Sequence, residues 1–209
     1  MKAFVLLVVL LLCIACNVPV DYPTTINIDS NMFKALAIKF LARELWKAPD
    51  YLGGLEPAYP IALADIDCLI SRDTNWMSGG FICSTPKILI KKQNDYTLIS
   101  NRAELKKTYA PITSEQEALS YAILYTRFFA IFDIAFFKSS YTYFGETPSI
   151  SYVKFENGSY LVHLFSYQQF GCSHPYYSAL VKVYKSGDVE ILKKEVSFED
   201  PKQSNLCVD

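Results

Sequence analysis

The spacing of apolar residues changes several times along the chain, and each change marks a different predicted element. Between residues 29 and 47, apolar side chains recur at intervals of three and four, which is the period of a helix with one buried face. Asp29 or Ser30 provides an N-terminal cap, and Pro49 ends the segment. The sequence therefore predicts an amphipathic helix over residues 30–47 that packs against a core.

Prolines and glycines then interrupt the pattern. Residues 48–62 contain three Pro and two Gly, so this segment is predicted to be a loop. Two short runs follow at residues 87–92 and 96–100, separated by a polar turn. They predict a pair of strands joined as a hairpin.

Two helices are predicted by their capping residues. Asn101 stands three residues before a glutamate and caps a short helix that ends near Tyr109. Ser114 and Glu117 form a capping box, in which the hydroxyl accepts from a backbone N–H and the carboxylate reaches back. A second helix is therefore expected from Glu115 to at least residue 125.

The continuation of this second helix is ambiguous. Residues 118–137 contain ten Leu, Ile or Phe, worth about −3 to −6 kcal/mol for insertion into a bilayer. Arg127 and Asp133 oppose insertion by about 5–7 kcal/mol, so the segment is not expected to span a membrane. We expect a buried helix, which an aromatic strand from Ala130 can follow. The pattern does not decide between helix and strand for residues 126–138.

The last third of the chain predicts antiparallel strands. Asn157-Gly158 favours a type I′ turn, because both positions tolerate positive φ. This turn places Phe155 opposite Tyr160 and Tyr152 opposite His163.

A second hairpin is expected from residues 177–185 and 189–194. The sequence thus predicts an α+β fold, with amphipathic helices on antiparallel sheet and a C-terminal four-stranded pair of hairpins. In its order of elements this layout resembles cystatin-like and PepSY-like modules, which implies no function.

The amino terminus has the pattern of an export signal. After Lys2, residues 3–15 are all apolar, which fits a signal peptide and is shorter than the roughly 20 residues of a membrane-spanning helix. Ala15 and Cys16 end this run, and residues 17–23 introduce the polar Asn17 and Asp21 and contain two prolines. We expect cleavage directly before Cys16.

Residues 1–16 resemble the signals of bacterial lipoprotein precursors, in which a cysteine after the cut carries diacylglycerol. The match rests on Ala15 and Cys16 and departs at Cys13, where the family usually has an aliphatic residue. The resemblance implies lipidation of Cys16 and a membrane-associated mature protein. The expected organisation is a signal peptide (1–15), a tether (16–28) and one α+β domain (29–209), with sub-lobes 29–110 and 111–209 as the alternative.

The number of cysteines supports this interpretation. Cleavage removes one of six cysteines and leaves five, and a lipid on Cys16 leaves an even number for disulfides. The four are Cys68, Cys83, Cys172 and Cys207, which allow three pairings. We favour Cys68–Cys83 with Cys172–Cys207. Ordinary secretion with a free or intermolecularly paired Cys16 is the alternative.

Charge and composition exclude some classes of function. The mature chain has 19 basic and 21 acidic residues, a net charge of −2, and no long basic run, which argues against nucleic-acid binding. Hydrophobic residues make up 51% of the sequence, which excludes disorder as the main state.

Few side chains suggest chemistry. His174 lies two residues after Cys172, yet a disulfide removes the thiol nucleophile. His163 is expected to be hydrogen-bonded and half-buried beside Tyr152. Tyr176 and Tyr177, at a hairpin entrance, are the preferred contact surface. Tyr152, His163, His174, Tyr176 and Tyr177 are therefore the binding candidates.

No metal or cofactor site is predicted. Asp65 and Asp67 share a strand face, and Asp73 does not complete a calcium loop. No nucleotide-binding or nucleophile motif is present. We therefore expect an envelope protein without a cofactor, which binds or assembles with an envelope protein or glycan. A hydrolase acting on glycan or peptide is the alternative.

Overall fold

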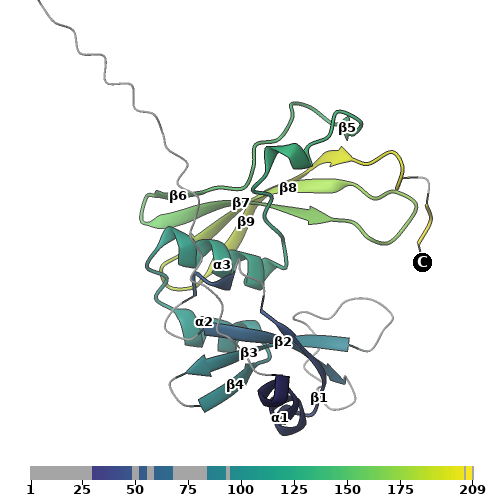
Figure 1. Cartoon of the computed structure of the whole chain (residues 1–209). Coiled ribbons are helices and arrows are strands. Elements are labelled where there is room, and N and C mark those ends of the chain that lie inside the picture. The colour runs from purple at the N-terminus through teal and green to yellow at the C-terminus, as the bar shows by residue number, and fades with distance from the viewer. Residues whose placement is uncertain are drawn as a thin grey trace, which may run out of the picture.

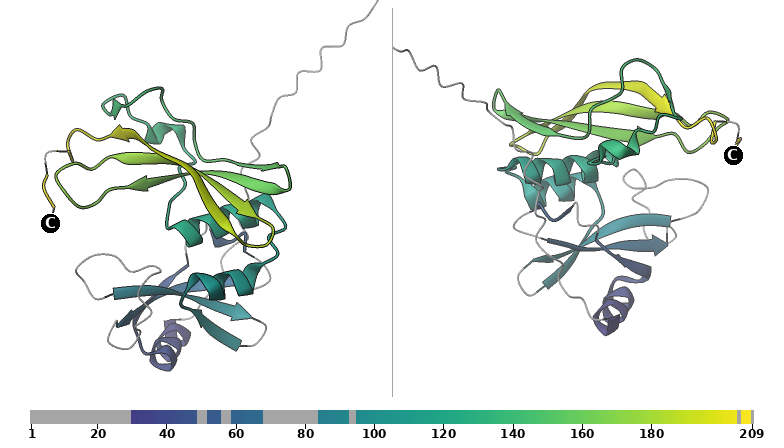
Figure 2. Two further views of the ribbon diagram at one scale, coloured as in Figure 1. Left: turned by 180° about the vertical axis from the view of Figure 1, so that it is seen from behind. Right: turned by 45° about the horizontal axis from the view of Figure 1, so that its top comes forward.

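The computed structural model describes residues 30–48, 52–55, 59–67, 84–92, 95–204 and 206–208. Two antiparallel sheets enclose a layer of helices between them, and a further helix covers the outer face of the first sheet (Figures 1 and 2). The α+β fold class predicted from the sequence is therefore confirmed.

The N-terminal sheet follows directly after the first helix. Its four strands lie in the order β1-β2-β3-β4, so each strand pairs with its neighbour in sequence. The elements are α1 (Ser30–Phe40), β1 (Ala42–Lys47), β2 (Tyr59–Asp67), β3 (Ser84–Lys92) and β4 (Asp95–Ile99). The predicted hairpin at residues 87–100 is confirmed, with Lys92 opposite Asp95.

The prediction of one helix over residues 30–47 is wrong in its second half. Leu41 has a φ of 55°, which breaks the helix, and the next six residues form a strand that pairs with β2. Leu45 nevertheless packs in the same cluster as Leu36 of α1. The apolar spacing fitted a helix because the helix and the strand contribute to one core.

The prediction of a loop over residues 48–62 is also wrong at its end. Strand β2 begins at Tyr59, and Ile61 and Ala62 are buried within it. Pro60 lies where the pairing of β2 with β3 shifts register. A proline is tolerated in a strand at such a bulge, because the ladder there does not require its missing N–H.

The two helices between the sheets have the predicted caps. Helix α2 (Arg102–Tyr109) begins after Asn101, whose side chain accepts from the Glu104 N–H. Helix α3 (Glu115–Thr126) begins after Ser114, whose hydroxyl accepts from the Glu117 N–H.

The capping box of α3 differs from the prediction in one contact. The Glu117 carboxylate accepts from the N–H and the hydroxyl of Thr113, at 2.7 and 3.0 Å. It therefore reaches one residue beyond Ser114, and it is buried in doing so.

Residues 126–138 are neither the long helix nor the strand that the sequence suggested. Arg127 has a φ of 64° and caps α3. The chain then makes one isolated bridge, from Phe129 to Phe165, and a short 3-10 helix at Ile134–Phe136. In the parts of the chain that the structure describes, no helix is long and apolar enough to cross a membrane.

The C-terminal sheet contains the two predicted hairpins. Its elements are β5 (Thr142–Tyr143), β6 (Val153–Glu156), β7 (Ser159–Tyr167), β8 (Tyr176–Tyr184) and β9 (Val189–Glu199), in the order β5-β9-β8-β7-β6. Phe155 pairs with Tyr160 as expected. The turn residues Asn157 and Gly158 have φ values of 50° and 78°, as a type I′ turn requires.

One hydrophobic core joins both sheets. Ile88 and Ile90 of β3 pack with α2 and α3 and with Val162 and Val181 of the C-terminal sheet. The opposite face of that sheet carries a separate aromatic cluster around Phe198. The helices between the sheets therefore hold the two halves of the protein together.

Candidate functional site

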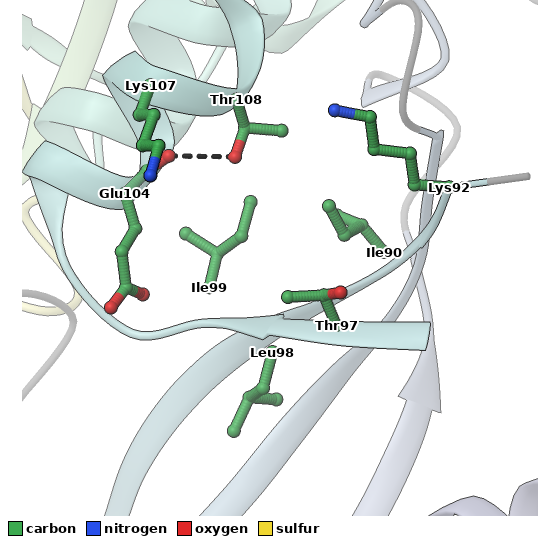
Figure 3. A pocket seen from close by; sticks show the side chains of 8 residues that line it. All are labelled: Ile90, Lys92, Thr97, Leu98, Ile99, Glu104, Lys107 and Thr108. Atoms are coloured by element: carbon green, nitrogen blue, oxygen red, sulfur yellow. Dashed lines mark hydrogen bonds between the residues drawn. The ribbon is translucent and has the colours of Figure 1, made fainter. Parts of the chain in front are cut away.

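A cavity of about 410 Å³ lies where the edge strand β4 meets α2. Figure 3 shows it between the β3–β4 hairpin and the helix. It is lined by Ile90, Lys92, Thr97, Leu98, Ile99, Glu104, Lys107 and Thr108. This volume lies within the range of small-molecule sites.

A local cap determines where α2 begins beside this cavity. Strand β4 passes into α2 through a tight cap, in which the Ser100 N–H donates to the Glu104 carboxylate at 2.7 Å. In return the Glu104 N–H donates to the Asn101 side chain at 2.9 Å. This reciprocal pair fixes the residue at which α2 begins. Packing of the whole core then sets the angle at which the helix lies beside the hairpin.

The accessible lining of the cavity is mostly polar. Ile90 and Ile99 lie at its base between the strands and the helix (Figure 3), but they belong to the core and are only 2% and 1% exposed. Thr97 and Thr108 add hydroxyl groups from opposite walls, and the Thr108 hydroxyl donates to the Glu104 carbonyl oxygen at 2.8 Å. The site therefore offers hydrogen-bonding groups and little accessible apolar surface.

The rim carries an excess of positive charge. Lys92 and Lys107 make no ion pair within the described ranges of the chain. The carboxylate of Glu104 is the single acidic group in the lining. By contrast, Lys106 on the same helix is paired with Asp188. Two ammonium groups and one carboxylate give this site a net charge of +1.

The predicted residue His163 lies on the outer face of the C-terminal sheet, away from this cavity. Its Nδ1 donates to the Ile150 carbonyl oxygen at 3.2 Å, and its Nε2 accepts from the Ser178 hydroxyl at 2.8 Å. The Tyr152 ring stacks on it, with 5.1 Å between centroids. The neutral imidazole can make both hydrogen bonds, one as donor and one as acceptor. Burial lowers the pKa of His163.

This environment predicts a dependence of stability on pH. In the unfolded chain His163 protonates near its ordinary pKa of 6.5, whereas the folded protein takes up this proton only at lower pH. The unfolded state therefore binds more protons below pH 6.5, and the free energy of unfolding falls as the pH is lowered. His163→Gln is expected to reduce this fall. Urea unfolding of both proteins between pH 5 and 8 measures it, and equal slopes would contradict the assignment.

His174 is buried in the loop between β7 and β8. Its Nδ1 lies 3.0 Å from the Gln168 carbonyl oxygen, and its Nε2 lies 2.5 Å from that of Leu206. Cys172, two residues earlier, forms a disulfide with Cys207. The bridge and the histidine hold the C-terminal segment against the loop, and the thiol is not available as a nucleophile.

Tyr176 and Tyr177, the residues predicted to form a contact surface, lie on opposite faces of β8. Tyr176 stacks on Phe198 with 4.6 Å between centroids, and burial raises its pKa to about 12. Tyr177 lies on the other face of β8, where its hydroxyl donates to Gln168 and the Lys194 ammonium lies 4.5 Å from its ring centroid. The sheet thus separates them, and they form no joint surface.

The remaining sequence candidates do not assemble into a metal site. Within the described residues, no group of three or more His, Cys, Asp or Glu side chains is placed to hold a metal ion. Asp65 and Asp67 lie on β2. Asp73, Cys68 and Cys83 are outside the described residues, as are Cys16 and the signal and tether segments at residues 1–28.

The chain matches no family model, no curated protein and no solved structure. Functional inference therefore depends on the residues and their geometry. Sequence reasoning did not identify the cavity, although it predicted both the hairpin and the cap that form it. The missing information was the angle at which α2 returns along the edge of the sheet.

Proposed function

We propose that the protein is exported and anchored in the bacterial cell envelope by a lipid on Cys16, where it acts as a non-catalytic binding component. The signal pattern of residues 1–16 supports export. The disulfide between Cys172 and Cys207 supports maturation in an oxidising compartment. It also uses two of the four cysteines that remain when Cys16 carries a lipid.

The character of the cavity beside α2 supports binding over hydrolysis, and it is the observation that carries this proposal. Glycoside hydrolysis generally needs two carboxylates on either side of the bond that breaks. This lining contains one carboxylate, Glu104, which accepts from the Ser100 N–H. Two lysines that make no ion pair with any described residue are suited to holding an anionic group.

Buried ionisable groups elsewhere have structural partners. Lys87 is fully buried and donates to the Ser100 carbonyl oxygen at 3.0 Å, and Glu117 accepts from Thr113. Both histidines contact carbonyl or hydroxyl oxygens that fix their orientation. These contacts account for the groups without a catalytic role, and so they favour the binding function.

Intact-mass analysis of the protein isolated from its native envelope tests the anchor. We expect a chain that begins at Cys16 and carries the mass of a diacylglyceryl group. Cys16→Ser removes the acylation site, and this variant is expected to lose the lipid mass. Native protein that retains Met1 and is recovered without any envelope association would refute the proposal.

A further inference from the structure

We infer that His174 is a pH-dependent latch: as an imidazolium it holds the C-terminal segment (residues 206–208) on the loop between β7 and β8, and loss of its second ring proton loosens that segment. This inference does not depend on the lipid anchor or on the cavity beside α2. It follows from the acceptors around the two ring nitrogens, the burial of the ring and the disulfide next to it.

The first step concerns the hydrogen bonds of the ring. Nδ1 of His174 lies 3.0 Å from the Gln168 carbonyl oxygen, and Nε2 lies 2.5 Å from the Leu206 carbonyl oxygen. A carbonyl oxygen can only accept, so both ring nitrogens have to donate. A neutral imidazole carries one N–H, and the imidazolium carries two. The neutral ring would therefore direct a lone pair at one of these oxygens.

The second step compares the two histidines of the chain. His163 also contacts two oxygens, but one belongs to the Ser178 hydroxyl, which can donate as well as accept. The neutral ring of His163 can therefore make both of its hydrogen bonds. Both partners of His174 are carbonyl oxygens, and this residue is only 2% exposed, so water does not replace a lost contact. Deprotonation of His174 therefore breaks one buried hydrogen bond.

The third step concerns the other titratable groups around the ring. The Tyr167 ring stacks on His174, with 6.1 Å between centroids. Burial and, to a lesser degree, the charge of Asp200 raise the pKa of Tyr167, and burial raises that of Tyr176, which contacts Tyr167, to about 12. Both phenols are therefore neutral where histidine titrates. No described carboxylate lies within ion-pair distance of His174, so the charge on its ring depends on the two carbonyl groups.

The fourth step concerns which side of the latch moves. The Gln168 N–H donates to the Pro175 carbonyl oxygen at 3.1 Å, which fixes the loop side. Leu206 lies outside any helix or strand, and its side chain is 59% exposed, so the C-terminal segment is the side that moves. The Cys172–Cys207 disulfide holds the same segment covalently. We therefore expect loss of the proton to loosen the segment while the disulfide is intact, and to release it when the disulfide is absent.

NMR of the Cys16→Ser chain with ¹⁵N in its histidine rings tests the protonation state without changing the latch, and His163 is the internal control in the same sample. The pH is raised from about 5 until both rings are neutral. We expect His163 to lose its second proton first and His174 to keep both N–H groups to a higher pH. The amide signals of residues 206–208 are expected to shift along the titration curve of His174. A His174 ring that becomes neutral before His163, or amide signals that do not follow it, would overturn the inference.

Removal of the disulfide isolates the contribution of the histidine. Cys172→Ser with Cys207→Ser, made in the same chain, leaves the segment held without a covalent bond. The readout is hydrogen exchange of the Val208 amide, which donates to the Gly171 carbonyl oxygen at 3.0 Å, corrected for its intrinsic rate at each pH. We expect this exchange to be at least about tenfold faster when His174 is neutral than when it is charged, the effect of one buried hydrogen bond.

Two further substitutions in the chain without the disulfide locate the effect. His174→Gln removes the titrating ring and is expected to abolish the pH-dependent step in Val208 exchange. His163→Gln makes the same change at the other histidine and is expected to leave the step in place. The signals of Val181, which is buried in β8, report whether each variant is folded. Equal Val208 exchange on both sides of the His174 titration, or loss of the step in both variants, would overturn the latch.

Discussion

Phe198→Ala is expected to lower the free energy of unfolding by about 3–5 kcal/mol, the largest effect of any single substitution considered for this chain. Phe198 is fully buried in the aromatic cluster on the outer face of the C-terminal sheet. Its ring pairs with six other aromatic rings, those of Phe136, Phe137, Tyr141, Tyr143, Phe165 and Tyr176. Truncation removes these contacts and leaves a cavity that the sheet cannot close.

Phe144→Ala is the matched control. This substitution makes the same chemical change beside the same sheet. The Phe144 N–H donates to the Ser197 carbonyl oxygen, and the substitution keeps this backbone hydrogen bond. Its side chain is 53% exposed, so the expected loss is within about 0.5 kcal/mol. Urea denaturation with the disulfide intact measures both values. Comparable losses in the two variants would show that the aromatic cluster is not a cooperative part of the fold.

Gly187→Ala is expected to destabilise the protein by about 2–5 kcal/mol. Gly187 has a φ of 82° in the turn between β8 and β9, a conformation that costs an L-residue about 1–2 kcal/mol. A Cβ at this position would lie 3.0 Å from Lys106 and 3.2 Å from Ala110 of the helix layer, and such crowding costs a further 1–3 kcal/mol or so. The turn also accepts a hydrogen bond from the buried Tyr121 hydroxyl at 2.9 Å.

Gly158→Ala separates these two contributions. Gly158 has nearly the same φ, 78°, in the other hairpin turn, but apart from its two chain neighbours no described residue has an atom within 4 Å of an added Cβ. This variant is therefore expected to show the backbone strain alone, about 1–2 kcal/mol. The difference between the two variants, from thermal or urea unfolding, measures how tightly the second hairpin packs on α2. Equal losses of unfolding free energy in the two variants would mean that the crowding at Gly187 is relieved by a shift of the turn that does not destabilise the protein.

Short-range signals predicted most of the individual elements. The Asn157-Gly158 turn specified its own hairpin and the pairing of Phe155 with Tyr160, because a two-residue turn fixes the register of both strands. Asn101 and Ser114 marked the starts of α2 and α3, because capping depends on hydrogen bonds within one turn. These features need no information from distant parts of the chain.

Predictions failed where two elements shared one core. Leu45 fits the helical period that starts in α1, yet it belongs to β1 and reaches the same cluster from the sheet. Local periodicity cannot distinguish a helix from a strand here, because burial of the apolar side chain stabilises both arrangements. The segment after Thr126 failed for a related reason: its aromatic residues pack on Phe165 and Phe198, and this long-range contact replaces regular pairing.

The sequence alone determined the α+β class, the hairpins, the caps and the pattern at residues 1–16, since each is encoded within a few neighbouring residues. Tertiary structure alone decided where α1 ends and how one core joins the two sheets. It also decided that Lys92 and Lys107 border the same cavity. These two lysines are fifteen positions apart in the chain, and their approach depends on the angle between a strand and a helix. That angle is set by packing of the whole core, which no local pattern contains.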